Sequence, residues 1–295
     1  MNILLPKFEC IKPNNEKELF DLMYKYTGRK VGILAGGTDL LPTIHAGKLT
    51  IDYMIDISSL GLNEIIEKDG AVHIGSMVNF RQLTLNKLIQ DKLPALLKAA
   101  KTVGAVQTRS LATIGGNICS AVPSCDSAPA LIALGAKLLL NSSNGHRIIN
   151  IEDFFKGPRK NALNSGEILY EIIIPLPNNY SQADFIKYGR RKALTLAKVN
   201  GASMLELDNE KKVIACRIAL GAVAPTPIRA VKAEDFLIGK EINSEIIDEA
   251  SKIALSEISP ISDIRSSADY RLQMSKVIVK RTLSNVYDLL VKEII

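Results

Sequence analysis

Two pairs of adjacent glycines are the residues of this sequence whose type and spacing point most directly to chemistry. The first pair lies in AGGTD at residues 35–39, and the second lies in TIGGN at residues 113–117. Glycine lets the backbone approach a ligand closely and adopt positive φ, and successive N–H groups in such a turn form a concave anion site. Each pair alone could be no more than a tight turn. Two such turns, each beside a hydroxyl or amide side chain, predict a clamp that holds a pyrophosphate from both sides.

Other kinds of site receive little support. The sequence contains neither G-x-G-x-x-G nor G-x-x-x-x-G-K-[ST], and it shows no Ser/His/Asp set and no paired carboxylates at catalytic spacing. The three histidines are dispersed, and the four cysteines do not follow the spacing of zinc or iron–sulfur ligands. We therefore predict no catalytic side chain and no metal site in this chain, and we expect Cys10 and Cys216 to be reduced, partly buried thiols.

Composition and charge place the chain among ordinary globular proteins. Its 295 residues are 47% hydrophobic and 23% charged, with a net charge of +6 at pH 7. Aromatic residues make up only 5%, and the basic residues are scattered apart from KYGRRK at 187–192, so we predict no nucleic-acid binding. No apolar run approaches the roughly 20 residues of a membrane span, and the N-terminus does not resemble a signal peptide. We expect a cytoplasmic protein that does not contact a membrane.

The elements that must position the glycine stretches belong to two regions of different pattern. Residues 1–175 read as a mixed α/β region. Its predicted elements are a helix at 16–26, strands at 30–37, 53–60 and 71–80, a proline-interrupted helix at 81–104, a helix at 128–136, a hairpin at 137–155 and a strand at 167–177. From residue 180 onward, three strands at 183–193, 197–207 and 213–230 predict an antiparallel sheet, followed by helices at 243–258 and 268–294. A sheet followed by helices predicts a separate α+β domain at 176–295.

Five stretches, in the right order and spread over nearly the whole chain, resemble those of one known family. They are ILAGGTDLLP, ATIGGNICSAVPSCDSAPALIALGA, FFKGPRKNALNSGEILYEIIIP, FIKYGRRKALTLAKVNGA and SDIRSSADYRLQMSKVIVKRTL. Together they resemble the FAD subunit of the molybdenum hydroxylases, the family of xanthine dehydrogenase and carbon monoxide dehydrogenase. The resemblance implies an α+β protein. Its FAD-binding domain would be of the vanillyl-alcohol-oxidase/PCMH type, at 1–175 with subdomains of about 1–55 and 56–175, and a smaller α+β domain would follow at 176–295.

The resemblance also implies which residues bind FAD, without a covalent bond. The first glycine stretch would wrap the diphosphate through its N–H groups, and the second would form the opposite wall. Asp126 would bind the ribose hydroxyls, although it could instead cap the helix that follows it. Lys187 would approach the isoalloxazine ring, although it could instead be a surface lysine, and the neighbouring Tyr188 would face the other side of its strand. The full implied set is Leu34, Ala35, Gly36, Gly37, Thr38, Asp39, Leu40, Thr113, Ile114, Gly116, Asn117, Asp126, Leu169 and Lys187.

The function implied by the resemblance is electron transfer within a complex. Molybdopterin would sit on a large partner subunit and two [2Fe-2S] clusters on a small one, and FAD on this chain would pass electrons to NAD⁺ or another acceptor. Two alternatives also fit the sequence. One is a free-standing flavin-dependent oxidoreductase, and the other is a non-catalytic, partner-binding module that kept the fold.

Overall fold

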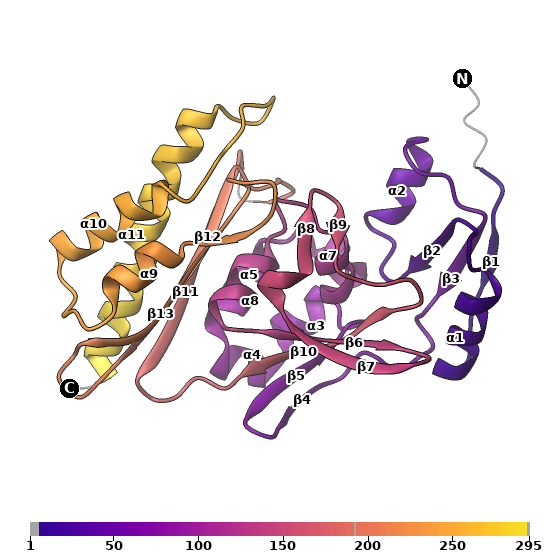
Figure 1. The fold of residues 1–295 in the computed structure, drawn as a ribbon, viewed down its shortest axis with the longest axis horizontal. Coiled ribbons are helices and arrows are strands. Elements are labelled where there is room, and N and C mark those ends of the chain that lie inside the picture. The colour runs from indigo at the N-terminus through magenta and orange to yellow at the C-terminus, as the bar shows by residue number, and fades with distance from the viewer. Residues whose placement is uncertain (1–5, 192, 294–295) are drawn as a thin grey trace.

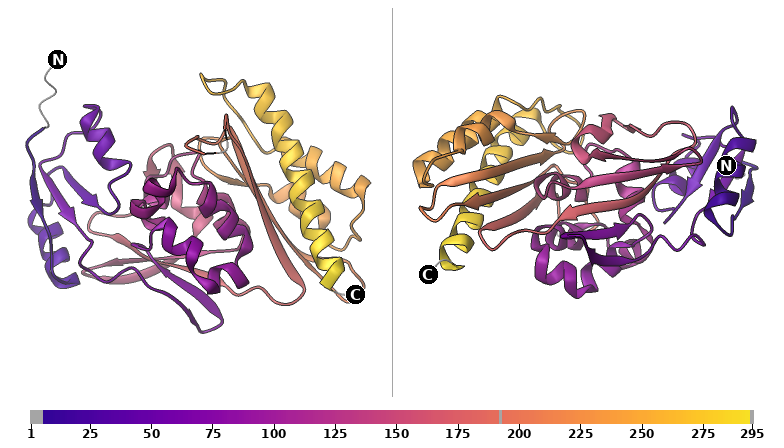
Figure 2. Two further views of the ribbon diagram at one scale, coloured as in Figure 1. Left: turned by 180° about the vertical axis from the view of Figure 1, so that it is seen from behind. Right: turned by 60° about the horizontal axis from the view of Figure 1, so that its bottom comes forward.

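A computed structural model describes residues 6–191 and 193–293 of the chain. The molecule is elongated, with strands β1 to β3 near one end and the C-terminal helices at the other (Figure 1). Three parts follow one another along its length, as the views of Figure 2 also show: a small parallel sheet, a five-stranded antiparallel sheet with helices, and a four-stranded antiparallel sheet with three helices. Within the described ranges, no helix is both long and apolar enough to cross a bilayer.

The N-terminal part is a parallel sheet with two helices. Its elements are β1 (Glu9–Ile11), α1 (Glu16–Lys25), β2 (Val31–Leu34), α2 (Leu40–His45) and β3 (Tyr53–Asp56), with strand order β1-β3-β2. Helix α1 begins at Asn15, whose side chain accepts a hydrogen bond from the N–H of Glu18 at 2.9 Å. Helix α2 follows β2 after only five residues, which places the first glycine stretch at the end of a strand.

The middle part surrounds the largest hydrophobic core. Its sheet has the order β4-β5-β10-β6-β7, made of β4 (Ile65–Lys68), β5 (Ala71–Gly75), β6 (Lys137–Ser142), β7 (Gly145–Asn150) and β10 (Ile168–Pro175). Its helices are α3 (Phe80–Leu85), α4 (Lys87–Lys92), α5 (Pro94–Thr102), α6 (Val106–Leu111), α7 (Ile114–Cys119) and α8 (Ser127–Ala133). A short 3-10 helix (Ile151–Phe154) leads into the small hairpin of β8 (Phe155–Gly157) and β9 (Lys160–Asn161). The predicted hairpin is confirmed, but it ends at Asn150 because the following residues form the 3-10 helix. The predicted helix at 128–136 is confirmed as α8.

The C-terminal part is an antiparallel sheet covered on one face by helices. Its elements are β11 (Ser181–Tyr188), β12 (Val199–Leu207), β13 (Val213–Gly221), β14 (Ile228–Arg229), α9 (Val231–Leu237), α10 (Ser244–Leu255) and α11 (Ala268–Glu293). Helix α10 begins where Asn243 accepts the N–H of Ile246 at 2.9 Å. The antiparallel sheet and the two long helices are confirmed, but the predicted third strand at 213–230 is two strands, β13 and β14, which makes the sheet four-stranded. The break between the two larger sheets falls between Pro175 and Ser181.

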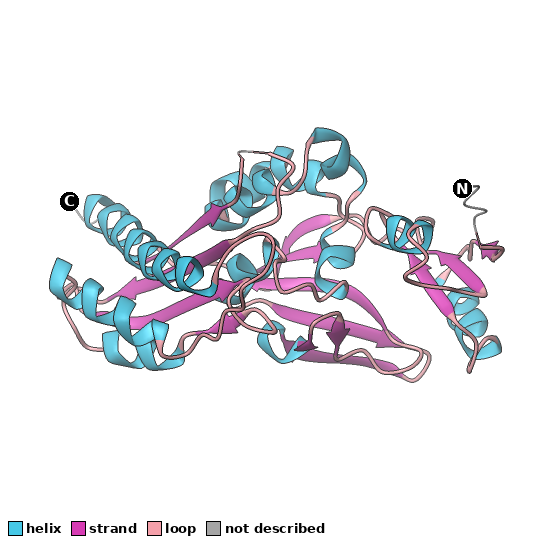
Figure 3. Ribbon diagram, turned by 90° about the horizontal axis from the view of Figure 1, so that it is seen from above, coloured by secondary structure: helices cyan, strands magenta, loops and turns pink. Residues whose placement is uncertain are grey.

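Strands β11 and β12 share two cores because their side chains alternate between the two faces of the sheet. Phe185 and Ala202 point toward α5 and α8 and belong to the core of the middle part, whereas Val199 and Leu205 pack with the C-terminal helices. Figure 3 shows helices on both sides of this sheet. The alternation also separates neighbours. Lys187 reaches the middle part, and Tyr188 accepts a hydrogen bond from Arg281 of α11 at 2.6 Å.

Candidate functional site

The first glycine stretch forms the turn between β2 and α2, and it leaves its backbone donors free. Gly37 has φ +69°, which only glycine adopts without strain. Gly36 has no room for a side chain, because a Cβ there would lie 2.0 Å from the carbonyl oxygen of Leu111. Within the described part of the chain, the N–H groups of residues 36–39 donate to no protein acceptor. Successive free N–H groups in a turn can form a concave site for an anion.

The second glycine stretch is helical, so the prediction of a second turn is wrong. Thr113 caps α7 by accepting the N–H of Gly116 at 3.1 Å, and the N–H of Gly115 donates to Ser76 at 3.0 Å. The N–H of Asn117 is bound to Thr113 as well. The N–H groups of Gly115, Gly116 and Asn117 therefore already donate hydrogen bonds to protein oxygens and are not available to a ligand. The glycines serve close packing instead: a Cβ on Gly115 would lie 2.6 Å from the Ser76 oxygen, and Gly116 lets α7 face Ala35 across the cleft.

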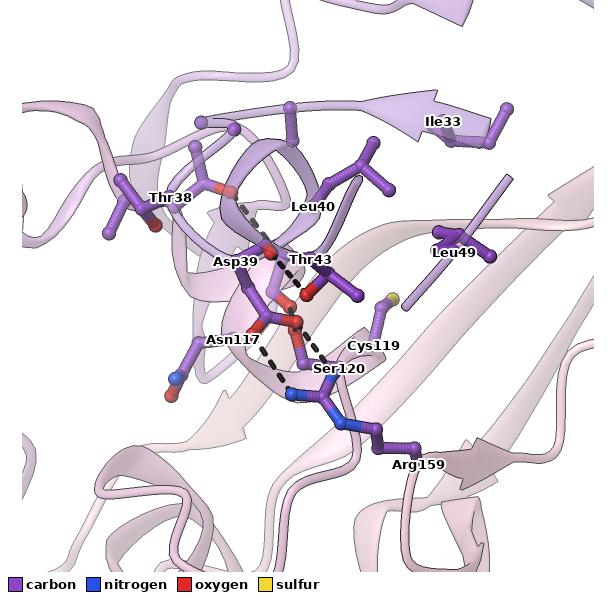
Figure 4. Close-up of a pocket in the computed structure, with 16 residues that line it drawn as sticks. Ile33, Thr38, Asp39, Leu40, Thr43, Leu49, Asn117, Cys119, Ser120 and Arg159 are labelled. Atoms are coloured by element: carbon purple, nitrogen blue, oxygen red, sulfur yellow. Dashed lines mark hydrogen bonds and ion pairs between the residues drawn. The ribbon is translucent and has the colours of Figure 1, made fainter. Parts of the chain in front are cut away.

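The two stretches line adjoining cavities between the N-terminal and middle parts. One cavity of about 340 Å³ extends toward β2, α2 and Leu49 (Figure 4). The other, of about 430 Å³, extends toward Val103 and the segment 194–196. Both volumes are in the range of small-molecule sites. The residues that line both cavities are Thr38, Asp39, Ala112, Asn117, Ser120 and Arg159.

Asn117 is oriented by a buried hydroxyl and a buried thiol. Its Oδ1 accepts hydrogen bonds from Ser127 Oγ at 2.7 Å and from Cys125 Sγ at 3.0 Å. Since both contacts are donated to the oxygen, the amide nitrogen Nδ2 and its two hydrogens remain for the cleft that Asn117 lines. The side chain thus adds donors on α7, opposite the free N–H groups of residues 36–39.

Asp126 and Lys187 form an ion pair at the wall of the second cavity. Lys187 Nζ donates to Asp126 Oδ2 at 2.6 Å and to the Thr102 carbonyl at 3.0 Å, and Asn200 donates to Asp126 Oδ1 at 3.2 Å. Asp126 precedes α8 but makes no side-chain capping bond, so the capping alternative is wrong. The Lys187 side chain is only 5% exposed, which also excludes the surface-lysine alternative. The resemblance implies contacts with different parts of FAD for these two residues, whereas the structure joins them in one pair.

Burial of Asp126 makes stability depend on pH. Burial raises the pKa of Asp126 to about 6, against an opposing effect of Lys187, from an ordinary value of 3.8. The unfolded chain therefore loses this proton first. As the pH rises from about 4 to 6, the free energy of unfolding of the wild type should fall by about 3 kcal/mol relative to Asp126→Asn. Denaturant unfolding of the FAD-free proteins across this range measures the difference, and a flat or rising difference would contradict the expectation.

Arg159, in the turn between β8 and β9, is a cleft residue that the sequence did not single out. Its guanidinium donates to both oxygens of Asp39, from NH1 to Oδ2 at 2.9 Å and from NH2 to Oδ1 at 3.2 Å (Figure 4). Ser120 Oγ donates to the same carboxylate at 3.3 Å. The bonds from Arg159 hold the pKa of Asp39 below its ordinary value. A basic Pro-Arg-Lys turn at 158–160 was the available signal, but nothing local connects it with residue 39.

The structure brings most of the implied residues to the cleft. Ala35, Gly36, Gly37, Thr38, Asp39, Leu40, Thr113, Gly116 and Asn117 line the first cavity, and Asp126 lines the second. Four implied residues line neither cavity: Leu34 packs near Met54, Ile114 and Leu169 are buried in the core of the middle part, and Lys187 lies behind Asp126. The contacts of all these residues with FAD stay predictions. Arg190 and Arg191 bond to the Ile264 and Leu194 carbonyls.

Comparisons with known proteins agree with this architecture. The sequence matches the family described as "FAD binding domain in molybdopterin dehydrogenase" over residues 6–177 and the "CO dehydrogenase flavoprotein C-terminal domain" over residues 184–286. The putative xanthine dehydrogenase FAD-binding subunit of Escherichia coli K12 is 34% identical over 255 residues, covering 85% of this chain and 87% of the relative. The glyceraldehyde dehydrogenase medium chain of Sulfolobus acidocaldarius is 36% identical over 256 residues, covering 86% and 89%.

A solved structure shows that the likeness extends to the whole fold. Carbon monoxide dehydrogenase from Hydrogenophaga pseudoflava matches with a TM-score of 0.92 at 31% identity, covering 97% of this chain and 99% of that one. The expected α+β architecture, an FAD-binding domain followed by a C-terminal domain of helices and antiparallel sheet, is therefore confirmed. On the sequence match, the fold and the glycine-lined cleft together, this chain belongs to the FAD-binding flavoprotein subunits of the molybdenum hydroxylases, a family of oxidoreductases.

Proposed function

We propose that this chain is the electron-transfer subunit of a heteromeric molybdenum hydroxylase. One observation carries the proposal: the free N–H groups of residues 36–39 lie across the cleft from the amide nitrogen of Asn117, in cavities large enough for parts of a dinucleotide. These donors suit the diphosphate of FAD, because charge-assisted hydrogen bonds of about 1.5–3 kcal/mol each stabilise an anion. FAD, once bound, would supply the reversible acceptance of electrons, and the chain's own residues would hold and orient it.

Each wall would contribute differently to binding. Residues 36–39 would donate their N–H groups to phosphate oxygens. Asn117 would add its Nδ2 hydrogens, and Thr113 would offer the hydrogen of a hydroxyl whose oxygen already accepts from Gly116. Asp126 would contact the cofactor from the second cavity, with Lys187 holding the charge of its carboxylate in place. Since these two side chains are paired, we propose that they act at the same end of FAD.

Asn117→Asp should lower the affinity for FAD by at least tenfold. The substitution keeps the shape of the side chain but removes both Nδ2 hydrogens and places a negative charge opposite the diphosphate. Titration of the FAD-free protein by flavin fluorescence measures the change. Asn209→Asp, in the exposed turn between β12 and β13 and outside both cavities, is a matched control that should bind FAD normally. Unchanged affinity in Asn117→Asp would contradict the proposed role of α7.

The proposed partners are a small subunit with [2Fe-2S] clusters and a large subunit with molybdopterin. Support comes from the relatives, which are named as a FAD-binding subunit and a medium chain. In addition, the residues that the structure describes contain no group of three or more His, Cys, Asp or Glu side chains arranged to hold a metal. Electrons would enter from the clusters and leave to NAD⁺ or another acceptor. We further propose domains at 1–175 and 176–295 and a cytoplasmic location, where the four free thiols would stay reduced.

Purification of the native complex tests this function. We expect the chain to carry a flavin spectrum and to co-purify with an iron–sulfur chain and a molybdenum chain. Reduction of the clusters should then bleach the flavin absorbance. A yellow protein that purifies without partners and oxidises a substrate by itself would instead support a free-standing flavin oxidoreductase. A colourless protein that gains no flavin on incubation with FAD would support a non-catalytic module and sink the proposal.

A further inference from the structure

An ion pair across the cleft joins the two walls that the glycine stretches form. Asp39 belongs to the first stretch, and Arg159 belongs to the hairpin that is hydrogen-bonded to the C-terminal end of α7. The pair lies where the two cavities meet, because both residues line both cavities. Figure 4 shows the guanidinium reaching up to the carboxylate beneath α2. We call Asp39 and Arg159 the clasp.

The backbone holds Arg159 firmly at this place. Its N–H donates to the carbonyl of Ala121 at 2.9 Å, and Asn161 Nδ2 donates to the carbonyl of Cys119 at 2.8 Å. Both Arg159 and Ala121 have left-handed backbone conformations, with φ of +58° and +44°. Residues without a glycine's freedom adopt such conformations at a cost that the surrounding structure must offset, and they are frequent at ligand sites. The hairpin therefore carries Arg159 at a fixed distance from α7.

The charges of the clasp matter for an anion that enters the cleft. The carboxylate of Asp39 lies on the stretch that offers free N–H groups, and it would repel a diphosphate. Among the described residues that line the two cavities, Arg159 is the sole lysine or arginine. Both side chains of the clasp are about half exposed, so their pairing is weak and can be exchanged at little cost. A guanidinium can bind a phosphate in the same bidentate way as it binds a carboxylate.

We propose that Arg159 is the diphosphate-binding cation of this cleft and that Asp39 is its placeholder. Before a dinucleotide binds, the carboxylate holds the guanidinium between the two walls. When a dinucleotide binds, its diphosphate accepts hydrogen bonds from Arg159 and from the free N–H groups of residues 36–39. The carboxylate of Asp39 then turns to solvent. The inference rests on the proposed function, since it assigns the ligand of the same site. It adds Arg159 to the residues that contact the diphosphate, and it predicts that this contact raises the affinity of the chain for FAD.

Opposite effects of the two partners test the clasp. In titrations of the FAD-free full chain, Arg159→Gln should weaken FAD binding by roughly 10- to 100-fold, the loss expected for a charge-assisted pair. ADP carries the diphosphate without the flavin. The affinity of Arg159→Gln for ADP, measured by competition with FAD, should fall by a similar factor. Arg159→Lys should regain part of the affinity. Asp39→Asn keeps the backbone donor and frees Arg159, so it should bind FAD at least as tightly as the wild type.

A second bidentate pair provides the matched control. Arg147 donates to both oxygens of Glu167 at 2.8 Å, in the middle part but outside the two cavities. Arg147→Gln should leave the affinity for FAD and ADP unchanged. Wild-type affinity in Arg159→Gln, an unchanged affinity for ADP in that variant, or weaker FAD binding in Asp39→Asn would each overturn the clasp. A wild-type chain that binds no FAD would overturn the proposed function itself.

Discussion

Gly36→Ala should yield a protein that binds FAD at least 100-fold more weakly than the wild type. A Cβ at this position would lie 2.0 Å from the carbonyl oxygen of Leu111 and 3.0 Å from the Cα of Ala112. Both atoms belong to the backbone just before α7, so no flexible side chain can give way. The first glycine stretch must therefore move away from α7, and the spacing of the two walls changes. We expect a loss of stability near the upper end of the 1–3 kcal/mol range for overpacking.

Gly47→Ala separates this clash from the loss of glycine's flexibility. Gly47 follows α2 with φ +66°, and a Cβ there would meet nothing within 4 Å. The substitution should cost about 1 kcal/mol through backbone strain alone, with normal FAD binding. Flavin fluorescence titration and thermal unfolding of both variants provide the comparison. If Gly36→Ala bound FAD as well as Gly47→Ala does, the close approach of the two walls would not matter for the cofactor.

Lys187→Met should destabilise the FAD-free protein by about 3–5 kcal/mol at pH 8. Methionine is similar in length but cannot pair with Asp126, whose carboxylate would be left charged and mostly buried. The two bonds that Lys187 Nζ donates, to Asp126 and to Thr102, would also be lost. The destabilisation should shrink on acidification, because Asp126 can then take up a proton and become neutral. Urea unfolding at pH 8 and at pH 5 measures both effects.

The double variant Lys187→Met/Asp126→Asn tests whether the pairing itself causes the loss. Removing the buried charge together with its partner should restore much of the stability, because a neutral amide can still accept from Asn200. Lys212→Met is a useful control, since Lys212 pairs with Glu210 outside the two cavities and both side chains are at least about half exposed, so losing this pair should cost little stability. A double variant no more stable than Lys187→Met would show that Lys187 contributes by packing and not by charge.

Much of the fold follows from patterns that lie within a few residues of one another. Helices α10 and α11 have apolar residues at helical spacing, and the hairpin of β6 and β7 turns at the polar segment before Gly145. Short elements escaped prediction for the same reason. Strands β1 and β8 have three residues each, too few for an alternation to show. The helical state of the second glycine stretch was also missed, although Thr113 stands at the capping position and is a local signal for a helix start.

The sequence alone determined the two glycine pairs, the resemblance carried by five ordered motifs and the position of Asp126 ahead of α8. Only the tertiary structure decided what these residues contact. Asp39 meets Arg159 across 120 positions of the chain, and Asp126 meets Lys187 across 61. Such pairs depend on how the hairpin of β8 and β9 and strand β11 pack against distant helices. The strength of each ion pair depends on how far the folded protein buries the two charges. A short stretch of sequence carries no information about that burial. Residue types within short motifs therefore predicted an anion-binding site. The tertiary structure determined which distant residues, Arg159 and Lys187, pair with Asp39 and Asp126.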